Sequence, residues 1–230
     1  MTYLVNFPTS LKKNKLPGFF LALEGIDGSG KTTQSQILCD HLNASGKVAS
    51  VLHFPRKESG LLAELNASIL SGKKKIPQEA FQYLFSADYT MLVNEEIVPR
   101  LEKGEIVITD RFHCYSSVAY GLFDTKKEID RIYAQSLMVA NGLLSTHFQF
   151  FVPDMTFYLD VSISTALERM SKKENKDIYE KKDVLEAVAR GYAFLRDEFP
   201  DEFQYIDAER SIDEVTKNMV QILSNSSIKL

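Results

Sequence analysis

The chain has 230 residues, 44% of them hydrophobic and 25% charged, which suits one ordinary globular α/β domain. The net charge of −4 excludes nucleic-acid binding by bulk positive charge, so any phosphate must be bound by local cations and backbone amides. No apolar stretch approaches the roughly 20 residues that span a bilayer, and the first residues lack the charge-then-apolar order of a secretory signal. We therefore expect a cytoplasmic protein with no membrane or nucleic-acid partner and with Cys39 and Cys114 as free thiols.

Short apolar runs alternate with helical patterns along the chain, which predicts βαβ units and a parallel sheet. Strands are predicted at residues 19–23, 48–54, 106–108, 156–159 and 204–206. The first is apolar throughout, as expected for a strand that is buried on both faces. This α/β pattern predicts a five-stranded parallel β-sheet flanked by helices on both faces.

Proline and capping residues mark the ends of several predicted helices. Pro77 is expected to begin a long helix that Pro99 kinks or ends. Ser211 and Glu214 have the spacing of a capping box, which predicts the start of the last helix. No linker divides the chain, so we predict a single domain over residues 18–230, preceded by an N-terminal extension over residues 1–17.

A phosphate-binding loop follows the first predicted strand. Residues 25–32 read G-I-D-G-S-G-K-T and match the pattern G-x-x-x-x-G-K-S/T at every fixed position, between a buried strand and an amphipathic helix. Glycines let successive backbone N–H groups turn inward around an anion, and the helix N-terminus adds a favourable dipole. Lys31 is expected to reach the β- and γ-phosphates of a nucleotide and Thr32 to bind Mg²⁺. The loop predicts phosphate binding but does not choose among a GTPase, a motor ATPase and a small-molecule kinase.

Two further strands end in arginine-containing segments. Arg56 follows the second predicted strand, and Asp110 and Arg111 follow the third. Ligands bind beyond the carboxyl ends of parallel strands, so these arginines are placed to contact a phosphate and Asp110 to hold the shell of a metal ion. A surface charge for Arg56 and a local ion pair for Asp110 and Arg111 are the alternatives.

Two aromatic residues on the long helix are candidates for stacking on a base. Phe81 and Phe85 lie one helical turn apart, so one of them can offer an aromatic face to a ligand. Residues at this spacing are more often part of the core, which is the alternative interpretation.

Taken together in chain order, these segments resemble the thymidylate kinase family over most of the chain, from about residue 19 to residue 222. The segments that carry the resemblance are residues 27–34 (D-G-S-G-K-T-T-Q), 54–56 (F-P-R), 84–89 (L-F-S-A-D-Y), 110–112 (D-R-F) and 116–121 (S-S-V-A-Y-G). The ordered set is far more specific than any one of its members. The resemblance implies the P-loop kinase fold with a small lid, at about residues 169–182 here, and a homodimer.

The resemblance also implies roles around the acceptor phosphate. Arg56 and Arg111 are expected to hold that phosphate, and Asp27 to contact the 3′-hydroxyl of the acceptor sugar. Asp110 is expected to act through the water shell of Mg²⁺. Because the acceptor phosphate is itself the nucleophile and is ionised near neutral pH, no general base is required.

Base and sugar recognition follow the family pattern only in part. The resemblance implies that Phe85 stacks on thymine and that Tyr120 crowds the 2′ position of the sugar and so favours deoxynucleotides. Tyr89 stands where the family has an arginine that helps to read thymine, and the glutamine of the family's A-Y-Q-G is missing, because Gly121 follows Tyr120 directly. These two departures bear on the identity of the acceptor base.

The lid also departs from the family pattern. Family members commonly carry an arginine there, whereas residues 177–180 read D-I-Y-E. The phosphate-binding loop supplies no arginine either, so Arg169 and Lys173 are the predicted lid cations.

The sequence therefore predicts thymidylate kinase activity, the ATP-dependent phosphorylation of dTMP to dTDP, with Mg²⁺ as cofactor. The alternatives are a related P-loop kinase of another nucleotide or deoxynucleoside, or a non-catalytic nucleotide-binding protein. The predicted ATP-binding residues are Gly25, Asp27, Gly28, Ser29, Gly30, Lys31, Thr32 and Thr33. The predicted acceptor-binding residues are Asp27, Phe54, Arg56, Phe85, Tyr89, Arg111, Ser116 and Tyr120. The predicted catalytic residues are Lys31, Asp110, Arg111, Arg169 and Lys173.

Overall fold

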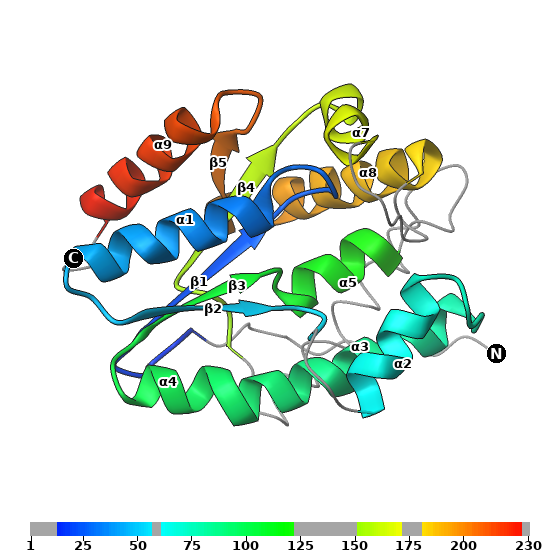
Figure 1. Cartoon of the computed structure of the whole chain (residues 1–230), viewed down its shortest axis with the longest axis horizontal. Helices are drawn as coiled ribbons and strands as arrows, with labels where there is room; N and C mark the ends of the chain where they lie inside the picture. Colours follow the sequence, from blue (N-terminus) through cyan, green and yellow to red (C-terminus); the bar gives the residue numbers. More distant parts are fainter. Residues whose placement is uncertain (1–12, 57–60, 122–150, 172–180, 227–230) are drawn as a thin grey trace.

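The computed structural model describes residues 13–56, 61–121, 151–171 and 181–226 (Figure 1). Within them, five strands form one sheet in the order β2-β3-β1-β4-β5, and every neighbouring pair is parallel. The strands are β1 (Phe19–Glu24), β2 (Ala49–His53), β3 (Ile106–Asp110), β4 (Met155–Asp160) and β5 (Gln204–Asp207). Each overlaps a predicted strand, so the predicted five-stranded parallel sheet is confirmed.

Helices cover both faces of this sheet, as predicted. Figure 1 shows α1 and α9 on one face and the α3–α4 helix with α5 on the other. The helices are α1 (Lys31–Ala44), α2 (Leu61–Leu70), α3 (Gln78–Leu92), α4 (Val98–Glu102), α5 (His113–Gly121), α7 (Ile163–Ser171), α8 (Lys182–Glu198) and α9 (Ile212–Asn225). The loops that precede α1 and α5 directly follow β1 and β3. Both loops therefore lie at the carboxyl edge of the sheet.

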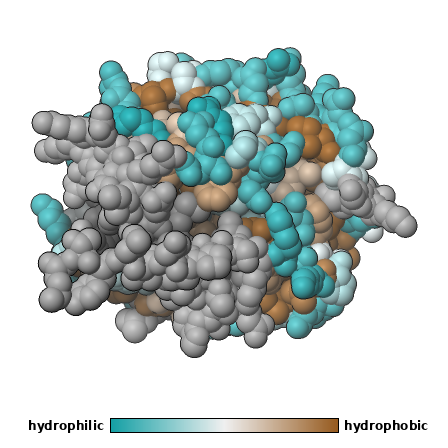
Figure 2. All heavy atoms as spheres, turned by 180° about the vertical axis from the view of Figure 1, so that it is seen from behind, coloured by the Kyte–Doolittle hydropathy of each residue, from teal (hydrophilic) through white to brown (hydrophobic). Residues whose placement is uncertain are grey.

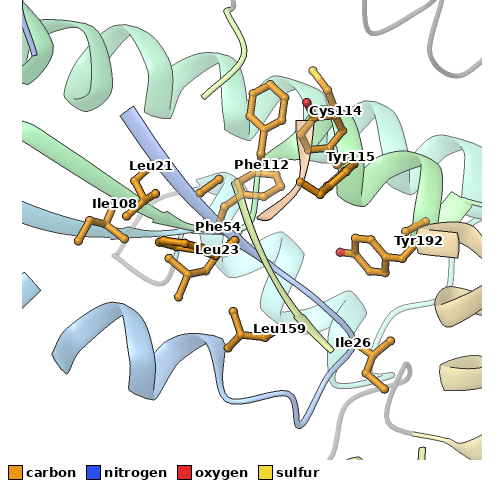
Figure 3. Packing of buried hydrophobic residues seen from close by; sticks show 14 of the residues in the cluster. Leu21, Leu23, Ile26, Phe54, Ile108, Phe112, Cys114, Tyr115, Leu159 and Tyr192 are labelled. Atoms are coloured by element: carbon orange, nitrogen blue, oxygen red, sulfur yellow. The ribbon is translucent and has the colours of Figure 1, made fainter. Parts of the chain in front are cut away.

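The core forms on both sides of β1, because this strand lies in the middle of the sheet. Leu21 pairs in register with Ile108 of β3, and both are fully buried (Figure 3). Phe112 and Tyr115, just after β3 and on α5, pack with ring centroids 5.0 Å apart. Burying a large apolar side chain contributes about 1.5–3 kcal/mol, so this core holds the strand ends in fixed positions.

The long helix after Pro77 does not end at Pro99. A five-residue π-helix, Val93–Ile97, follows α3, and α4 then continues to Glu102 with Pro99 in its first turn. Pro99 is tolerated in this first turn because proline lacks only an N–H that has little use there, and the wider π turn makes room next to its ring. Of the two predicted outcomes, an end at Pro99 is wrong, since the helical path continues past it, and a kink there stays a prediction.

The predicted capping box is present at the start of α9. The Glu214 backbone N–H donates to Ser211 Oγ at 3.4 Å, and the Ser211 backbone N–H donates to Glu214 Oε2 at 3.1 Å. We expect Ser211→Ala to lower the free energy of unfolding by about 1 kcal/mol, because an N-cap bond is lost. Denaturant unfolding measures this, with Ser224→Ala on the exposed face of α9 as the control. A change no larger than that of the control would contradict it.

The described part of the predicted N-terminal extension contacts the domain. Lys13 forms an isolated parallel bridge with Val152, and its Nζ lies 2.8 Å from Glu202 Oε1. Asn14 Nδ2 donates to Asp154 Oδ2 at 2.7 Å. Lys13 and Asn14 thus contact the segments that precede β4 and β5. The domain boundary at residue 18 stays a prediction.

Seen from behind the view of Figure 1, the described part of the surface mixes hydrophilic and hydrophobic side chains (Figure 2).

Both cysteines, Cys39 and Cys114, are buried and free, as predicted. Among the described residues, no helix is long and apolar enough to cross a membrane.

Candidate active site

The phosphate-binding loop connects β1 to α1 and depends on its glycines. Gly28 has φ 84°, and a Cβ atom there would lie 2.5 Å from the carbonyl oxygen of Ala166 in α7. Gly30 caps α1 with φ 98°. These backbone angles favour glycine, and they let the first N–H groups of α1 face the loop, where an anion can bind.

Lys31 lies inside this loop, at the first residue of α1. Its Nζ donates to the carbonyl oxygens of Gly25 at 2.9 Å and Ile26 at 2.8 Å. Burial, together with the charge of Arg111, lowers the pKa of Lys31 to about 8 against the opposing effect of nearby carboxylates. The ammonium group is therefore mostly charged at neutral pH. It is held by these two carbonyl groups and, at 3.4 Å, by Ser29 Oγ, all of them neutral partners that an anionic phosphate can replace.

A cavity of about 440 Å³, the phosphate pocket, opens above the loop and falls in the size range of small-molecule sites. Of the eight predicted ATP-binding residues, all but Gly25 line it, together with Asp110, Arg111 and Arg169. Arg169 is fixed by a 2.8 Å bond from Nη2 to the carbonyl oxygen of Ala208. Lys173, the other predicted lid cation, lies outside the described residues.

Arg210 also lines the phosphate pocket, and the sequence analysis missed it. Its guanidinium pairs with Asp207 at 2.9 Å across an exposed turn between β5 and α9. The signal was available, since Arg210 follows a predicted strand and directly precedes the capping box, at the same sheet edge as the loop.

Asp110 and Thr32 meet at the edge of the phosphate pocket. Thr32 Oγ1 donates to Asp110 Oδ2 at 2.5 Å, and His53 Nδ1 lies 3.5 Å from the same oxygen. Burial raises the pKa of Asp110, but the nearby His53 ring, the charges of Lys31 and Arg111 and the hydrogen bond from Thr32 outweigh it and hold the pKa well below its usual range. Asp110 is therefore ionised throughout the neutral range.

These two oxygens fit Mg²⁺ that arrives with a nucleotide. Among the described residues there is no group of three or more His, Cys, Asp or Glu side chains that could enclose a cation. Mg²⁺ commonly binds through one or two protein oxygens and completes its shell with water and substrate phosphates. The donor set of Thr32 and Asp110 matches that mode.

Arg111 stands in the left-handed region of backbone space, with φ 98°. A non-glycine residue there is strained by about 1–3 kcal/mol and persists only when its surroundings hold it. Arg111 Nη2 donates to Asp27 Oδ1 at 2.5 Å and to Tyr120 Oη at 2.6 Å. The ion pair thus joins Arg111 to Asp27, not to its neighbour Asp110, so the local-pair alternative is wrong.

A buried acid, Glu24, holds Arg111 in place through a shared tyrosine hydroxyl, and it was not among the predicted site residues. Glu24, at the end of β1, is fully buried and accepts from Tyr192 Oη at 2.6 Å. Arg111 Nη1 donates to the same Tyr192 hydroxyl at 3.2 Å. The chain of bonds from Glu24 through Tyr192 fixes the guanidinium plane. A carboxylate that ends an apolar strand was the signal in the sequence.

A second, smaller cavity, the aromatic pocket, adjoins the phosphate pocket. The two share Asp27, Phe54 and Arg111. The remaining residues that line the aromatic pocket are Pro55, Leu70, Gln82, Phe85, His113, Ser116, Ser117 and Tyr120. Five predicted acceptor-binding residues besides Arg111 are thus brought together there: Asp27, Phe54, Phe85, Ser116 and Tyr120.

The aromatic rings form two layers. Phe85 lines the aromatic pocket 5.7 Å from the ring of Phe54, whereas Phe81 packs behind Phe85 at 4.2 Å. Tyr89 lies under Phe54 at 5.1 Å, is 1% exposed and does not line either pocket. The structure therefore does not place Tyr89 beside a ligand. Its predicted part in acceptor binding can be exerted through the two pocket rings that it contacts, Phe54 and His113.

Arg56 is separated from the other predicted phosphate ligands. Its Nε donates to Asp88 Oδ1 at 2.7 Å and its Nη1 to Glu95 Oε2 at 2.9 Å. Neither pocket includes Arg56. The structure thus does not bring Arg56 together with Arg111, and its role stays a prediction.

His113 is a second pocket residue that the sequence analysis missed. It begins α5 and is buried against Phe54 with ring centroids 5.4 Å apart. Burial lowers the pKa of His113 to about 3, so the imidazole is neutral. Its Nε2 lies 2.8 Å from Ser86 Oγ.

A glycine-rich loop with a buried lysine, beside a second pocket where aromatic rings meet a fixed arginine, is the arrangement of a P-loop kinase. A sequence model of the family described as thymidylate kinase matches residues 23–219. A probable thymidylate kinase of Methanocaldococcus jannaschii is 34% identical over 90% of this chain and 96% of its own length. A thymidylate kinase of Thermoanaerobacter is 31% identical over 90% of this chain and 98% of its own length. The chain belongs to the thymidylate kinase family, whose members are nucleoside monophosphate kinases.

Proposed function

We propose that this protein transfers the γ-phosphoryl group of Mg²⁺-bound ATP to dTMP and yields ADP and dTDP. One observation carries the proposal beyond family membership. The two pockets meet at Asp27, Phe54 and Arg111, so a donor in one and an acceptor in the other approach each other at a half-buried arginine. Phosphoryl transfer needs such in-line placement and charge neutralisation more than it needs covalent help from the protein.

The phosphate pocket is the proposed donor site. The N–H groups at the start of α1 bind the phosphates, and Lys31 exchanges its carbonyl partners for the β- and γ-phosphates. Thr32 and Asp110 hold the Mg²⁺ that accompanies ATP, which supplies positive charge to the transferred group. Arg169 and Lys173 are the proposed lid cations that offset charge on the same group.

The aromatic pocket is the proposed acceptor site. Arg111 holds the acceptor phosphate, Asp27 accepts from the 3′-hydroxyl, and Tyr120 crowds the 2′ position of the sugar. Phe85 stacks on the base. Arg56 can join Arg111 only if its guanidinium exchanges Glu95 for the acceptor phosphate.

The transfer itself balances without a base from the protein. An oxygen of the ionised acceptor phosphate forms a bond to the γ-phosphorus while the bond from that phosphorus to the bridging oxygen of ADP breaks. Arg111 binds the attacking phosphate and so brings together two anions that otherwise repel. We further propose a homodimer, as the family resemblance implies, and size-exclusion chromatography with light scattering tests it.

Asp110→Asn should raise the Mg²⁺ concentration that gives half-maximal activity by about 10–100-fold, because a charged metal partner becomes neutral. The amide keeps the shape of the side chain and can still accept from Thr32, but it lacks the charge that Lys31 and Arg111 stabilise, so the free energy of unfolding should fall and Tm must be followed beside the kinetics. Initial rates at saturating ATP and dTMP over a Mg²⁺ titration measure the shift. An unchanged titration curve would remove Asp110 from the metal site.

ADP release with a panel of acceptors tests the proposed function. The panel contains dTMP, dUMP, dCMP, dGMP, UMP and CMP, each with Mg²⁺ and ATP. A preference for dTMP supports the proposal. A preference for another acceptor would retain the kinase mechanism but change the substrate, and no turnover with any of them would favour a nucleotide-binding protein.

A further inference from the structure

Gln82 on α3 carries a buried amide group that has no partner in the part of the chain that the structure describes. Its side chain is 6% exposed, and neither Nε2 nor Oε1 has a hydrogen-bond partner among the described residues. Leaving a buried donor and acceptor unpaired is costly, and nearly all such groups in native proteins are paired. Gln82 also lines the aromatic pocket, so a ligand there can satisfy both atoms.

The polar neighbours of Gln82 are already committed to one another. Ser86 Oγ donates its single proton to the carbonyl oxygen of Gln82 at 3.0 Å. His113 Nε2 lies 2.8 Å from the same Ser86 Oγ, so this nitrogen must be the donor of the neutral ring. These contacts engage Ser86 and the imidazole of His113. They leave the Gln82 amide available to a ligand in the aromatic pocket.

Gln82 is placed beside the proposed stacking residue. It precedes Phe85 by three residues on α3, so the two side chains share one face of the helix, and both line the aromatic pocket. A flat ring that packs on Phe85 presents its edge toward neighbouring positions of this face. Tyr89, which occupies the position of the family's base-reading arginine, is shielded from the pocket beneath Phe54.

We propose that Gln82 reads the acceptor base by pairing its amide with the Watson–Crick edge of that base. This rests on the proposed function, because the base must lie in the aromatic pocket. An amide presents a donor and an acceptor side by side, and thymine presents N3–H beside the O4 acceptor, so two hydrogen bonds form. The amide in its flipped orientation matches cytosine equally well, so Gln82 selects for a pairing edge and not for thymine over cytosine.

The test compares dTMP with its 2,4-difluorotoluene analogue in wild-type protein and in Gln82→Met. The analogue copies the shape of thymine but has fluorine in place of both carbonyl oxygens and C–H in place of N3–H. The wild type should prefer dTMP, and Gln82→Met should reduce the ratio of the two kcat/KM values by about 10–100-fold. The Tm of the unliganded variant should equal or exceed that of the wild type, because an unpaired buried amide is removed.

Gln36→Met is the matched control, because it makes the same change at an exposed position of α1 and should leave the ratio unchanged. If Gln82→Met lowers kcat/KM equally for both acceptors, or lowers Tm, the residue is structural and the inference is overturned. If the wild type turns over dTMP and the ratio is unchanged in the variant, only the assignment of Gln82 fails. If the wild type does not turn over dTMP, the proposed function fails and the inference falls with it.

Discussion

Arg111→Ala is expected to lower kcat/KM for dTMP by about 10³-fold, the scale on which a transition-state arginine acts in phosphoryl transfer. The reason lies in its position, since the guanidinium is where the two pockets meet and is fixed by Asp27, Tyr120 and Tyr192. The variant leaves the left-handed backbone at position 111 strained and removes the charge partner of Asp27, so its folding must be followed by Tm. Steady-state kinetics at varied dTMP and saturating ATP give the effect.

Arg100→Ala is the matched control for this experiment. Arg100 also pairs with two carboxylates, Glu96 and Glu105, but it lies on α4, just before β3 and thus at the amino end of the sheet. Its loss should leave kcat/KM within about twofold, because surface ion pairs contribute at most about 1 kcal/mol to stability and this one is far from the pockets. Similar kinetic effects of the two substitutions would contradict the role given to Arg111.

Lys31→Met is expected to lower kcat by about 10³-fold, because one preorganised charge on a reacting group is worth roughly that much in an enclosed site. Methionine keeps much of the apolar stem of the side chain. Single-turnover transfer from ATP to dTMP measures the loss, and nucleotide binding measured separately shows how much of it belongs to the bound ground state. A variant that retains more than a tenth of the wild-type rate would contradict the assignment.

The lowered pKa of Lys31 makes a second, pH-dependent prediction. The free enzyme loses the charge on this group as pH rises through about 8, so kcat/KM for ATP should fall above that pH. The proton count also affects folding. Between about 8 and the ordinary value of 10.5, the unfolded chain binds this proton and the folded chain does not, so Lys31 makes stability rise with pH in that window. Lys31→Met should lack both effects.

Local sequence was enough to predict the strands of the sheet and the part of the site that lies on the phosphate loop and after β3. The strands, the capping box of Ser211 and the phosphate loop all follow from periodicity, glycine positions and short motifs, which depend on neighbours along the chain. Asp110 and Arg111 were also predictable as site residues, because they follow a strand at the carboxyl edge of a parallel sheet.

Contacts between distant segments decided the rest. Arg56 and Asp88 are 32 positions apart, and nothing in either local sequence indicates the ion pair that keeps Arg56 out of the pockets. The resemblance places Tyr89 where the family has an arginine that helps to read thymine, but Tyr89 packs under Phe54, a contact between the segment after β2 and α3 that local sequence does not determine. In the sequence, Gln82 looks like an ordinary helical glutamine. Only the structure shows that it is buried and has no hydrogen-bond partner among the described residues.

The most direct test of the central claim follows both products of one reaction. Purified protein is mixed with Mg²⁺, radiolabelled γ-³²P ATP and dTMP, and dTDP and ADP are measured together over time. Equal amounts of labelled dTDP and ADP, with no ADP formed when dTMP is omitted, are the predicted result. Release of ADP with labelled inorganic phosphate and no dTDP would show that the aromatic pocket does not receive dTMP as acceptor and would contradict the account.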